Sequence, residues 1–416
     1  METPFIDRDK RIPVTVLSGS LGAGKTTTLN KVLNTEEELN AAVVVNDMGE
    51  VNIDAELVEK ESELDEDEEI VELSNGCICC RLRGDLLDEV GKLAQDRDFD
   101  YLLVESSGIS EPIPVAQTFA LGYDADFGPE DTGRDFDPSE IYELDTTVTV
   151  VDANAMHDAF DSGAALTDED IDEQSNRMPE GVVMDQIEFC DVLVLNKCDL
   201  VPDEELDEIE EVLRTLQPRA KILRSEHGNV NPEEILGTGR FDFEEAQKSA
   251  GWMHEMEHGH HHEDAAEEHG VTSFVYREHR PFHPERIADF LRRIPDDVIR
   301  AKGYFWIPNA DDVAMGVDKA GTSVRAGPSS KWLASLPERK IEAYFREYPE
   351  VKEDWHPEWG DRNTKLVFIG RGIDAEAIER ELDDCVMTDE ELEGSDALPN
   401  PFDVDGQGQK EFALGD

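Results

Sequence analysis

The chain has 416 residues, of which 99 are acidic and 38 are basic, so its formal net charge is −61. This charge argues against nucleic acid and anionic membranes as partners. The acids are spread over every segment, which predicts adaptation to a halophilic, high-salt cytoplasm where salt screens the charge. No apolar run approaches the roughly 20 residues that cross a bilayer, and residues 1–11 lack a hydrophobic signal region. We therefore expect a cytoplasmic protein.

Apolar, β-branched runs alternate with longer amphipathic stretches over roughly the first half of the chain. This alternation is the pattern of right-handed βαβ units, and the composition of the runs suits strands that are covered on both faces. The sequence therefore predicts an α/β domain with a mainly parallel sheet. The expected strands are 14–17, 42–46, 101–105, 147–151 and 192–195.

A glycine-rich segment between the first expected strand and a helix over 27–33 fits the P-loop pattern G-x-x-x-x-G-K-[ST] in full. The glycines let backbone N–H groups converge on phosphates at a helix N-terminus. Lys25 is expected to reach the β- and γ-phosphates, and the Thr26 hydroxyl is expected to bind Mg²⁺. The domain is thus predicted to be a P-loop NTPase whose phosphate-binding residues are Gly19, Gly22, Ala23, Gly24, Lys25, Thr26 and Thr27.

The next expected strand ends in the acidic segment 46–50, between the P-loop and a group of cysteines. A switch segment would occupy this place. Asp47 is a candidate catalytic residue because it could approach Mg²⁺, and Glu50 is a candidate ligand for a metal at the cysteines. A solvated loop acid remains the alternative for each.

Three of the six cysteines crowd into the motif Cys77-Ile78-Cys79-Cys80. In a cytosolic chain, such crowding suggests metal or redox chemistry before a disulfide framework. Thiolates are soft ligands for Zn²⁺ and Cu⁺ and, in mixed sets, for Co²⁺ or Ni²⁺. Three sulfurs leave a tetrahedron incomplete, so the fourth ligand would be Glu50, water or an acceptor protein. An incomplete set suits metal transfer better than a structural zinc site, which remains the alternative.

The strand over 101–105 ends in Glu105 and leads to the turn at Gly108. A carboxylate there could hold the water shell of Mg²⁺ or orient the attacking water, so Glu105 is a candidate catalytic residue. The Gly108 N–H could sense the γ-phosphate.

The motif Asn196-Lys197-Cys198-Asp199 follows the last expected strand of this domain. The Asp199 carboxylate could accept hydrogen bonds from guanine N1–H and the 2-amino group. Adenine lacks this donor pair and would leave the carboxylate unpaired. The Lys197 stem could lie over the base. The sequence thus predicts GTP as the nucleotide, with Asn196, Lys197 and Asp199 at the base.

A His- and Glu-rich stretch over 246–270 separates the two halves of the chain. It is either a linker or a segment that collects metal. Beyond it, strand-then-helix order at 272–277 and 284–293 recurs at 365–369 and 375–384, which predicts a smaller α+β domain. The predicted division is 1–245 for the GTPase domain, 246–270 for the linker, 271–392 for the second domain and 393–416 for an acidic disordered tail.

Together these motifs resemble those of the CobW-like metallochaperone GTPases. The stretches that carry the resemblance include 72–76 before the cysteines and 280–284, 300–303 and 366–370 in the second half. The resemblance implies a GTPase related to the nickel-insertion GTPases of urease and hydrogenase, with GTP and Mg²⁺ in the first domain and metal at Cys77, Cys79 and Cys80. Members are linked to zinc, to cobalt for cobalamin, or to the metal of nitrile hydratase.

We therefore expect a GTP-hydrolysing chaperone that passes a transition metal, zinc first and Co²⁺ as the alternative, to a client metalloprotein. A homo-oligomer is compatible with the sequence. The rivals are a metal buffer that binds GTP without hydrolysing it and a P-loop kinase, which the guanine-selective Asp199 disfavours.

Overall fold

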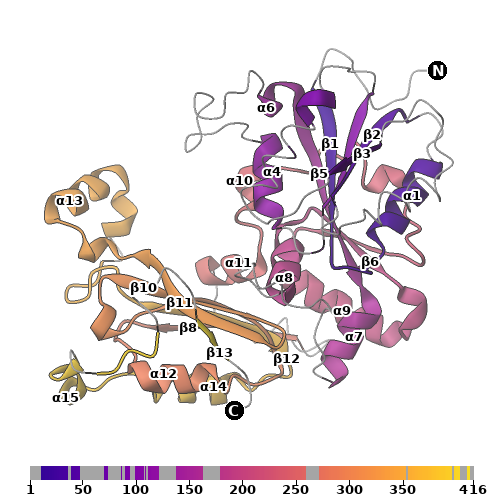
Figure 1. Cartoon of the computed structure of the whole chain (residues 1–416). Coiled ribbons are helices and arrows are strands. Elements are labelled where there is room, and N and C mark those ends of the chain that lie inside the picture. Colours follow the sequence, from indigo (N-terminus) through magenta and orange to yellow (C-terminus); the bar gives the residue numbers. More distant parts are fainter. Residues whose placement is uncertain are drawn as a thin grey trace. The chain divides into compact units, whose positions relative to one another are not determined.

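The apolar runs of the first half form strands of one sheet in the computed structural model (Figure 1). The chain divides into two compact units, Met1–Gly251 and Trp252–Asp416. The domain boundaries given above remain predictions. The structure describes residues 11–35, 39–46, 70–73, 86, 90–93, 99–106, 108, 111–120, 137–162, 179–258, 271–352, 355–395, 398–402 and 410–412.

Seven strands of the described ranges form the sheet of the first unit, in the order β3-β2-β4-β1-β5-β6-β7. Every neighbouring pair is parallel, which confirms the predicted architecture. The short edge strands β3 and β7 were not predicted, because each has four residues and carries charge among its apolar side chains. The strands are β1 (Ile12–Ser18), β2 (Ala41–Asn46), β3 (Ile70–Leu73), β4 (Tyr101–Glu105), β5 (Tyr142–Asp152), β6 (Val192–Asn196) and β7 (Lys221–Arg224).

Helices cover both faces of this sheet (Figure 1). On one face α1 contributes Leu29, Val32 and Leu33 to an apolar core with the strands. On the other face α4 contributes Val115 and Phe119 to a second core. Burial on both faces explains why the central strands are continuously apolar. The described helices of this unit are α1 (Lys25–Thr35), α4 (Pro112–Ala120), α6 (Pro138–Ile141), α7 (Ala153–Ser162), α8 (Pro179–Phe189), α9 (Asp203–Leu216) and α10 (Phe243–Ala246), with 3₁₀ turns η1 (Cys198–Leu200) and η2 (Pro232–Glu234). Helix α11 (Gly251–His258) begins at the last residue of this unit and otherwise belongs to the second.

A buried polar network ties the chain after η2 to the amino-terminal edge of the sheet. The Tyr101 hydroxyl donates to Asp145 Oδ2 at 3.0 Å, accepts from the Gly237 N–H at 3.0 Å and lies 2.8 Å from Thr15 Oγ1. Asp145 also accepts the N–H groups of Thr238 and Gly239. Burial, followed by the nearby charge of Asp145, raises the pKa of Tyr101, so the phenol stays protonated and can donate.

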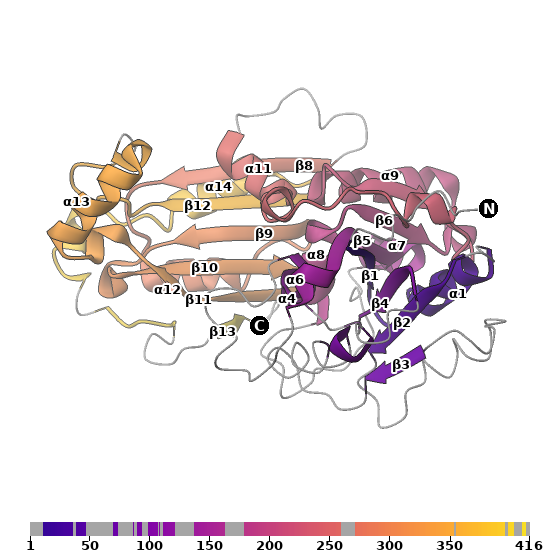
Figure 2. The ribbon, with the colours of Figure 1, turned by 90° about the horizontal axis from the view of Figure 1, so that it is seen from above.

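The second unit is built on an antiparallel sheet, which confirms the predicted α+β domain. Figure 2 shows its long strands side by side, and the described strands follow the order β13-β11-β10-β9-β12-β8. Helices α12 and α14 pack on one face, where Phe290 and Leu382 join the core. The elements are β8 (Val271–Glu278), α12 (Pro284–Leu291), β9 (Val298–Phe305), η3 (Pro308–Ala310), β10 (Val313–Ala320), β11 (Ser323–Lys331), η4 (Leu333–Ser335), α13 (Glu338–Glu347), η5 (Pro349–Lys352), β12 (Thr364–Arg371), α14 (Ala375–Asp383), α15 (Asp389–Leu392) and β13 (Lys410–Phe412).

Two described parts of the segment 393–416 contact the core and the sheet of the second unit. Phe402 is 2% exposed, and its ring lies 5.4 Å from that of Phe305 in the core. Strand β13 pairs with β11 at the edge of the sheet. No helix in the described ranges is long and apolar enough to cross a membrane.

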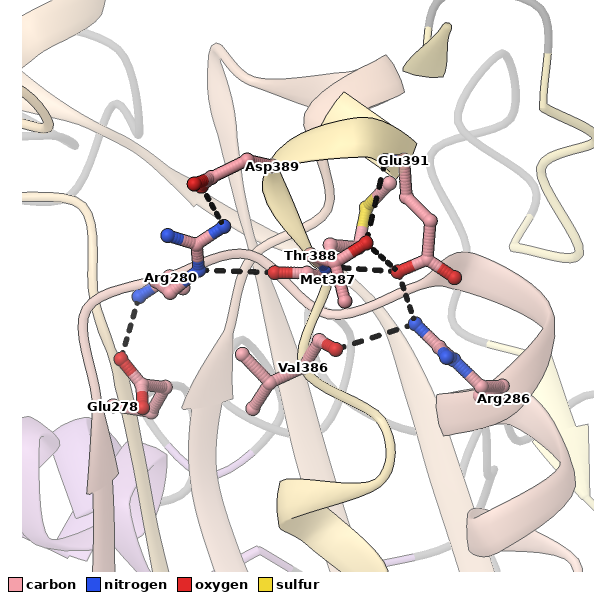
Figure 3. Close-up of polar contacts among 8 residues, drawn as sticks. All are labelled: Glu278, Arg280, Arg286, Val386, Met387, Thr388, Asp389 and Glu391. Atoms are coloured by element: carbon pink, nitrogen blue, oxygen red, sulfur yellow. Dashed lines mark hydrogen bonds and ion pairs between the residues drawn. The ribbon is translucent and has the colours of Figure 1, made fainter. Parts of the chain in front are cut away.

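Two arginines join the start of α12 to the segment that leads into α15 (Figure 3). Arg280 donates to the Met387 carbonyl at 2.9 Å and to the Asp389 carboxylate at 2.7 Å. Arg286 donates to the Glu391 carboxylate at 3.0 Å. We call this pair of arginines the arginine clamp. It supplies hydrogen-bond donors to the Met387 carbonyl and to two carboxylates of α15, a helix of four residues that is too short to be stable alone.

We expect Tyr101→Phe to lower the free energy of unfolding by about 1–3 kcal/mol, because it removes the hydrogen bonds that the buried Tyr101 hydroxyl makes with Asp145 and with the Gly237 N–H. Urea unfolding of the whole chain measures this. Tyr344→Phe, at a tyrosine that is 37% exposed, is the matched control and should change little. An unchanged midpoint for Tyr101→Phe would show that the network does not contribute to stability.

We also expect the anchoring of α15 to weaken in acid. The Thr388 N–H and then the Arg286 guanidinium lower the pKa of Glu391 below its ordinary 4.5. The stabilisation is therefore complete above that ordinary value and is lost as the pH falls through the lowered value. Hydrogen exchange over residues 385–395 should show protection that declines over this range in the wild type and is lower and flat with pH in Glu391→Gln. Flat protection in the wild type would contradict the assignment.

Candidate nucleotide site

The P-loop between β1 and α1 adopts a conformation that requires glycine at two positions. Gly19 has φ +138° and Gly24 has φ +104°, both in the region that side chains rarely adopt. A Cβ at Gly19 would lie 2.2 Å from the Val150 carbonyl oxygen. A Cβ at Gly24 would lie 2.3 Å from Asn196 Nδ2. The loop is therefore pressed against β5 on one side and against the end of β6 on the other.

Lys25 holds its ammonium group at the mouth of this loop. Its Nζ donates to the carbonyls of Gly19 at 2.9 Å and Ser20 at 3.1 Å, and the residue is buried. The charge thus lies where the backbone N–H groups of the loop and the N-terminus of α1 favour an anion. This arrangement is able to bind the phosphates of a nucleotide.

Thr26 and Glu105, both predicted to be catalytic, are brought into contact. The Thr26 hydroxyl donates to Glu105 Oε1 at 2.9 Å. Glu105 ends β4 beside β1, opposite Leu17, and is 1% exposed. A hydroxyl and a carboxylate beside a phosphate loop are the oxygen ligands that Mg²⁺ prefers, so this pair fits the ion.

The side chain of Asn196, at the end of β6, joins the P-loop to the loop after β7. Its Nδ2 donates to the Ala23 carbonyl of the P-loop at 2.9 Å, and its Oδ1 accepts the Gly228 N–H at 2.9 Å. Gly228, with φ +71°, lies so close to α1 that a Cβ there would be 2.8 Å from Thr28 N. We call this pair of hydrogen bonds the Asn196 latch.

Beyond the latch, the residues predicted to bind the base line the carboxyl end of β6. The Cys198 N–H donates to the Ser225 carbonyl at 3.1 Å, which holds the motif against the loop after β7. His227 Nε2 lies 3.9 Å from Asp199 Oδ2. Lys197 Nζ lies 2.5 Å from Asp152 Oδ2. Asp199 and Lys197 therefore border the same site as the P-loop, from the opposite side of the latch.

The remaining predicted residues are placed less closely or lie elsewhere. The Gly108 carbonyl accepts Gln186 Nε2 at 3.1 Å, Thr27 is exposed on α1, and the contacts of both with a nucleotide stay predictions. Five predicted residues fall outside the part of the chain that the structure describes: Asp47, Glu50, Cys77, Cys79 and Cys80. Within the described part, no three His, Cys, Asp or Glu side chains gather to hold a metal ion.

Two of the cysteines outside the motif, Cys190 and Cys385, are unsuited to metal binding. Cys190 and Cys385 are buried and free. Burial raises the pKa of Cys190 and raises the pKa of Cys385 to about 12. Both thiols therefore stay protonated, and protonated thiols are poor ligands.

Two residues of the site were not predicted from sequence, Asp152 and Gly228. Asp152 ends β5 as Glu105 ends β4. An acid at the carboxyl end of an apolar strand was therefore the available signal. Gly228 follows Ser225-Glu226-His227, a segment whose sequence is equally typical of an ordinary loop.

Asn196→Asp is expected to weaken nucleotide binding by about 10- to 100-fold, because a carboxylate oxygen would replace the donor that faces the Ala23 carbonyl. Titration with a fluorescent GDP analogue measures the affinity. Asn309→Asp, in the second unit, is a matched amide-to-acid control that should bind normally. Wild-type affinity in Asn196→Asp would show that the latch is dispensable.

Family models match most of each unit. The nucleotide-binding domain of CobW, HypB and UreG matches residues 13–224, and the C-terminal domain of the cobalamin synthesis protein CobW matches residues 271–386.

Relatives match over most of the chain. A zinc-regulated GTPase metalloprotein activator 1 from Dictyostelium discoideum is 41% identical over 403 residues, which cover 92% of this chain and 81% of that protein. The zinc chaperone YjiA of Escherichia coli is 27% identical, covering 88% of this chain and 96% of its own length. The zinc chaperone CobW of Sinorhizobium is 29% identical over 72% of this chain and 82% of its own length. With a complete phosphate loop and a guanine motif joined by the latch, the chain belongs to the CobW/HypB/UreG family and is a GTPase.

Proposed function

We propose that this GTPase is a metallochaperone, which binds zinc at Cys77, Cys79 and Cys80 and passes it to a client metalloprotein when GTP is hydrolysed. The observation that carries the proposal is the register of the sheet. One row of residues crosses four neighbouring strands in register: Leu17 of β1, Glu105 of β4, Val45 of β2 and Glu72 of β3. All four strands therefore end at one edge, the edge that bears the P-loop.

The spacing of the strands supports coupling between the cysteines and the nucleotide. Three interstrand steps of about 4.8 Å place Glu72 about 14 Å from Leu17. Cys77 follows Leu73, the last residue of β3, by four positions, and four residues span up to about 13 Å. The proposal therefore requires the segment after β3 to turn toward the phosphate loop, with Glu50 as the proposed fourth ligand.

The Thr26–Glu105 pair supports a Mg²⁺-dependent hydrolysis. Thr26 and Glu105 would hold the ion, with Asp47, which directly follows β2, as a further proposed contact. Mg²⁺ bound there would neutralise charge on the β- and γ-phosphate oxygens. Lys25 would bind the same phosphates, and the Gly108 N–H would contact the γ-phosphate.

Zinc is the proposed metal because thiolates prefer it and because the relatives named above are called zinc-regulated or zinc chaperones. A cobalt chaperone for cobalamin synthesis is the alternative, since a mixed set of thiolates and a carboxylate also accepts Co²⁺. The coupling is reciprocal in either case. If the bound nucleotide changes the affinity of the protein for the metal, the bound metal changes its affinity for the nucleotide by the same factor.

Replacing Cys77, Cys79 and Cys80 together by serine is expected to abolish high-affinity zinc binding and the response of hydrolysis to zinc, while zinc-free hydrolysis stays near the wild-type rate. In the wild type, zinc affinity should differ about 5- to 150-fold between the GDP state and that of a non-hydrolysable GTP analogue. Metal analysis and single-turnover hydrolysis, with and without Zn²⁺ or Co²⁺, measure these quantities.

The matched controls are Cys190→Ser and Cys385→Ser, whose thiols stay protonated in the core and should not matter for metal content. A triple variant that keeps its zinc and its zinc response would refute the site. Equal zinc affinity in both nucleotide states, or no hydrolysis under any metal condition, would support the alternative of a metal buffer and contradict the chaperone.

A further inference from the structure

The carboxylate of Asp152 occupies a place beside the base-binding motif that the predicted machinery does not use. Asp152 is the last residue of β5 and pairs in register with Asn196, the first residue of the guanine motif. Its Oδ1 accepts the N–H groups of Asn154 at 2.9 Å and Ala155 at 3.3 Å, at the start of α7. The carboxylate is therefore fixed in orientation by backbone donors.

The second oxygen of this carboxylate holds Lys197. The Lys197 Nζ lies 2.5 Å from Asp152 Oδ2, with 33% of the lysine side chain and 15% of the aspartate side chain exposed. The lysine side chain therefore extends from the end of β6 toward the end of β5.

The backbone of Lys197 is constrained as well. In the described residues, only Lys197 and His227 adopt positive φ among the non-glycine residues, at 62° and 53°. Both lie in the two loops joined by the hydrogen bond from Cys198 to Ser225. A left-handed conformation at a β-carbon-bearing residue persists only where the surroundings impose it, and such residues cluster at ligand sites.

From these contacts we infer that Asp152 is a positioning residue for guanine nucleotide binding, which acts by holding the Lys197 side chain over the base. A free lysine has many rotamers, and their loss on binding opposes affinity. A carboxylate that confines the ammonium beforehand removes most of that loss. The stem of Lys197 is then already extended when the base pairs with Asp199.

This role predicts an effect on affinity without an effect on chemistry. Asp152 lies on the base side of the latch, whereas Lys25, Thr26 and Glu105 lie on the phosphate side. GDP and GTP should therefore lose affinity equally, and hydrolysis at saturating GTP should be unchanged.

The test is a double-mutant cycle of Asp152→Ser and Lys197→Met in the full chain. Serine is as good a helix cap as aspartate but is too short and uncharged to hold the ammonium. We expect Asp152→Ser to weaken GDP and GTP binding and to raise KM by about 5- to 10-fold, with kcat within twofold. In the Lys197→Met background, the same change should cost less than twofold.

Asp137→Ser is the matched control, because Asp137 caps α6 through Ser139 N at the opposite end of β5. It should bind nucleotide normally. If Asp152→Ser does not fold, Asp152→Asn removes the charge and keeps the cap.

Three results would overturn the inference. Wild-type affinity in the Asp152 variants would leave only a helix cap. Additive losses in the double variant would mean that Asp152 does not act through Lys197. A fall in kcat at unchanged KM would place its effect on the chemical step.

Discussion

The nucleotide site depends on one buried amide. Asn196 is 2% exposed, and its two polar atoms are used in opposite senses, one as a donor to the P-loop and one as an acceptor from the loop after β7. No other side chain of this size offers a donor and an acceptor side by side. The shape of the phosphate loop is therefore tied to the shape of the loop after β7, although β5 and β6 lie between β1 and β7, the strands that carry these loops.

In the parallel sheet, the nucleotide-site residues and the stabilising hydrogen bonds of Tyr101 lie toward opposite ends of the strands. The described nucleotide-site residues lie at the carboxyl ends of its strands or in the loops that follow them, where successive loops meet at one edge. The amino-terminal part of the sheet is held by the hydrogen bonds of Tyr101 and Asp145. Substitutions at the two edges should thus have separable effects, on folding at one and on nucleotide affinity at the other.

In the second unit, only some strands of the antiparallel sheet could be predicted from the sequence. Strands β8 and β12 were predicted because they are apolar and are followed directly by helices. The strands between them, β9, β10 and β11, were not predicted. They contain Gly316 and Gly327 opposite each other and a fully buried Lys319, which break the alternation typical of a half-buried strand. Their pairing with neighbours supplies the hydrogen bonds that local composition did not indicate.

The sequence by itself determined two short motifs, the P-loop and the guanine motif, and predicts a third, the cysteine motif. Each is a run whose spacing alone brings its groups together. Only the tertiary structure decided which runs meet. The contacts of Asn196 with Ala23, Lys197 with Asp152 and Thr26 with Glu105 join residues 173, 45 and 79 positions apart. Such contacts are set by strand order and register, which depend on how the whole sheet is packed and leave no local pattern in the chain.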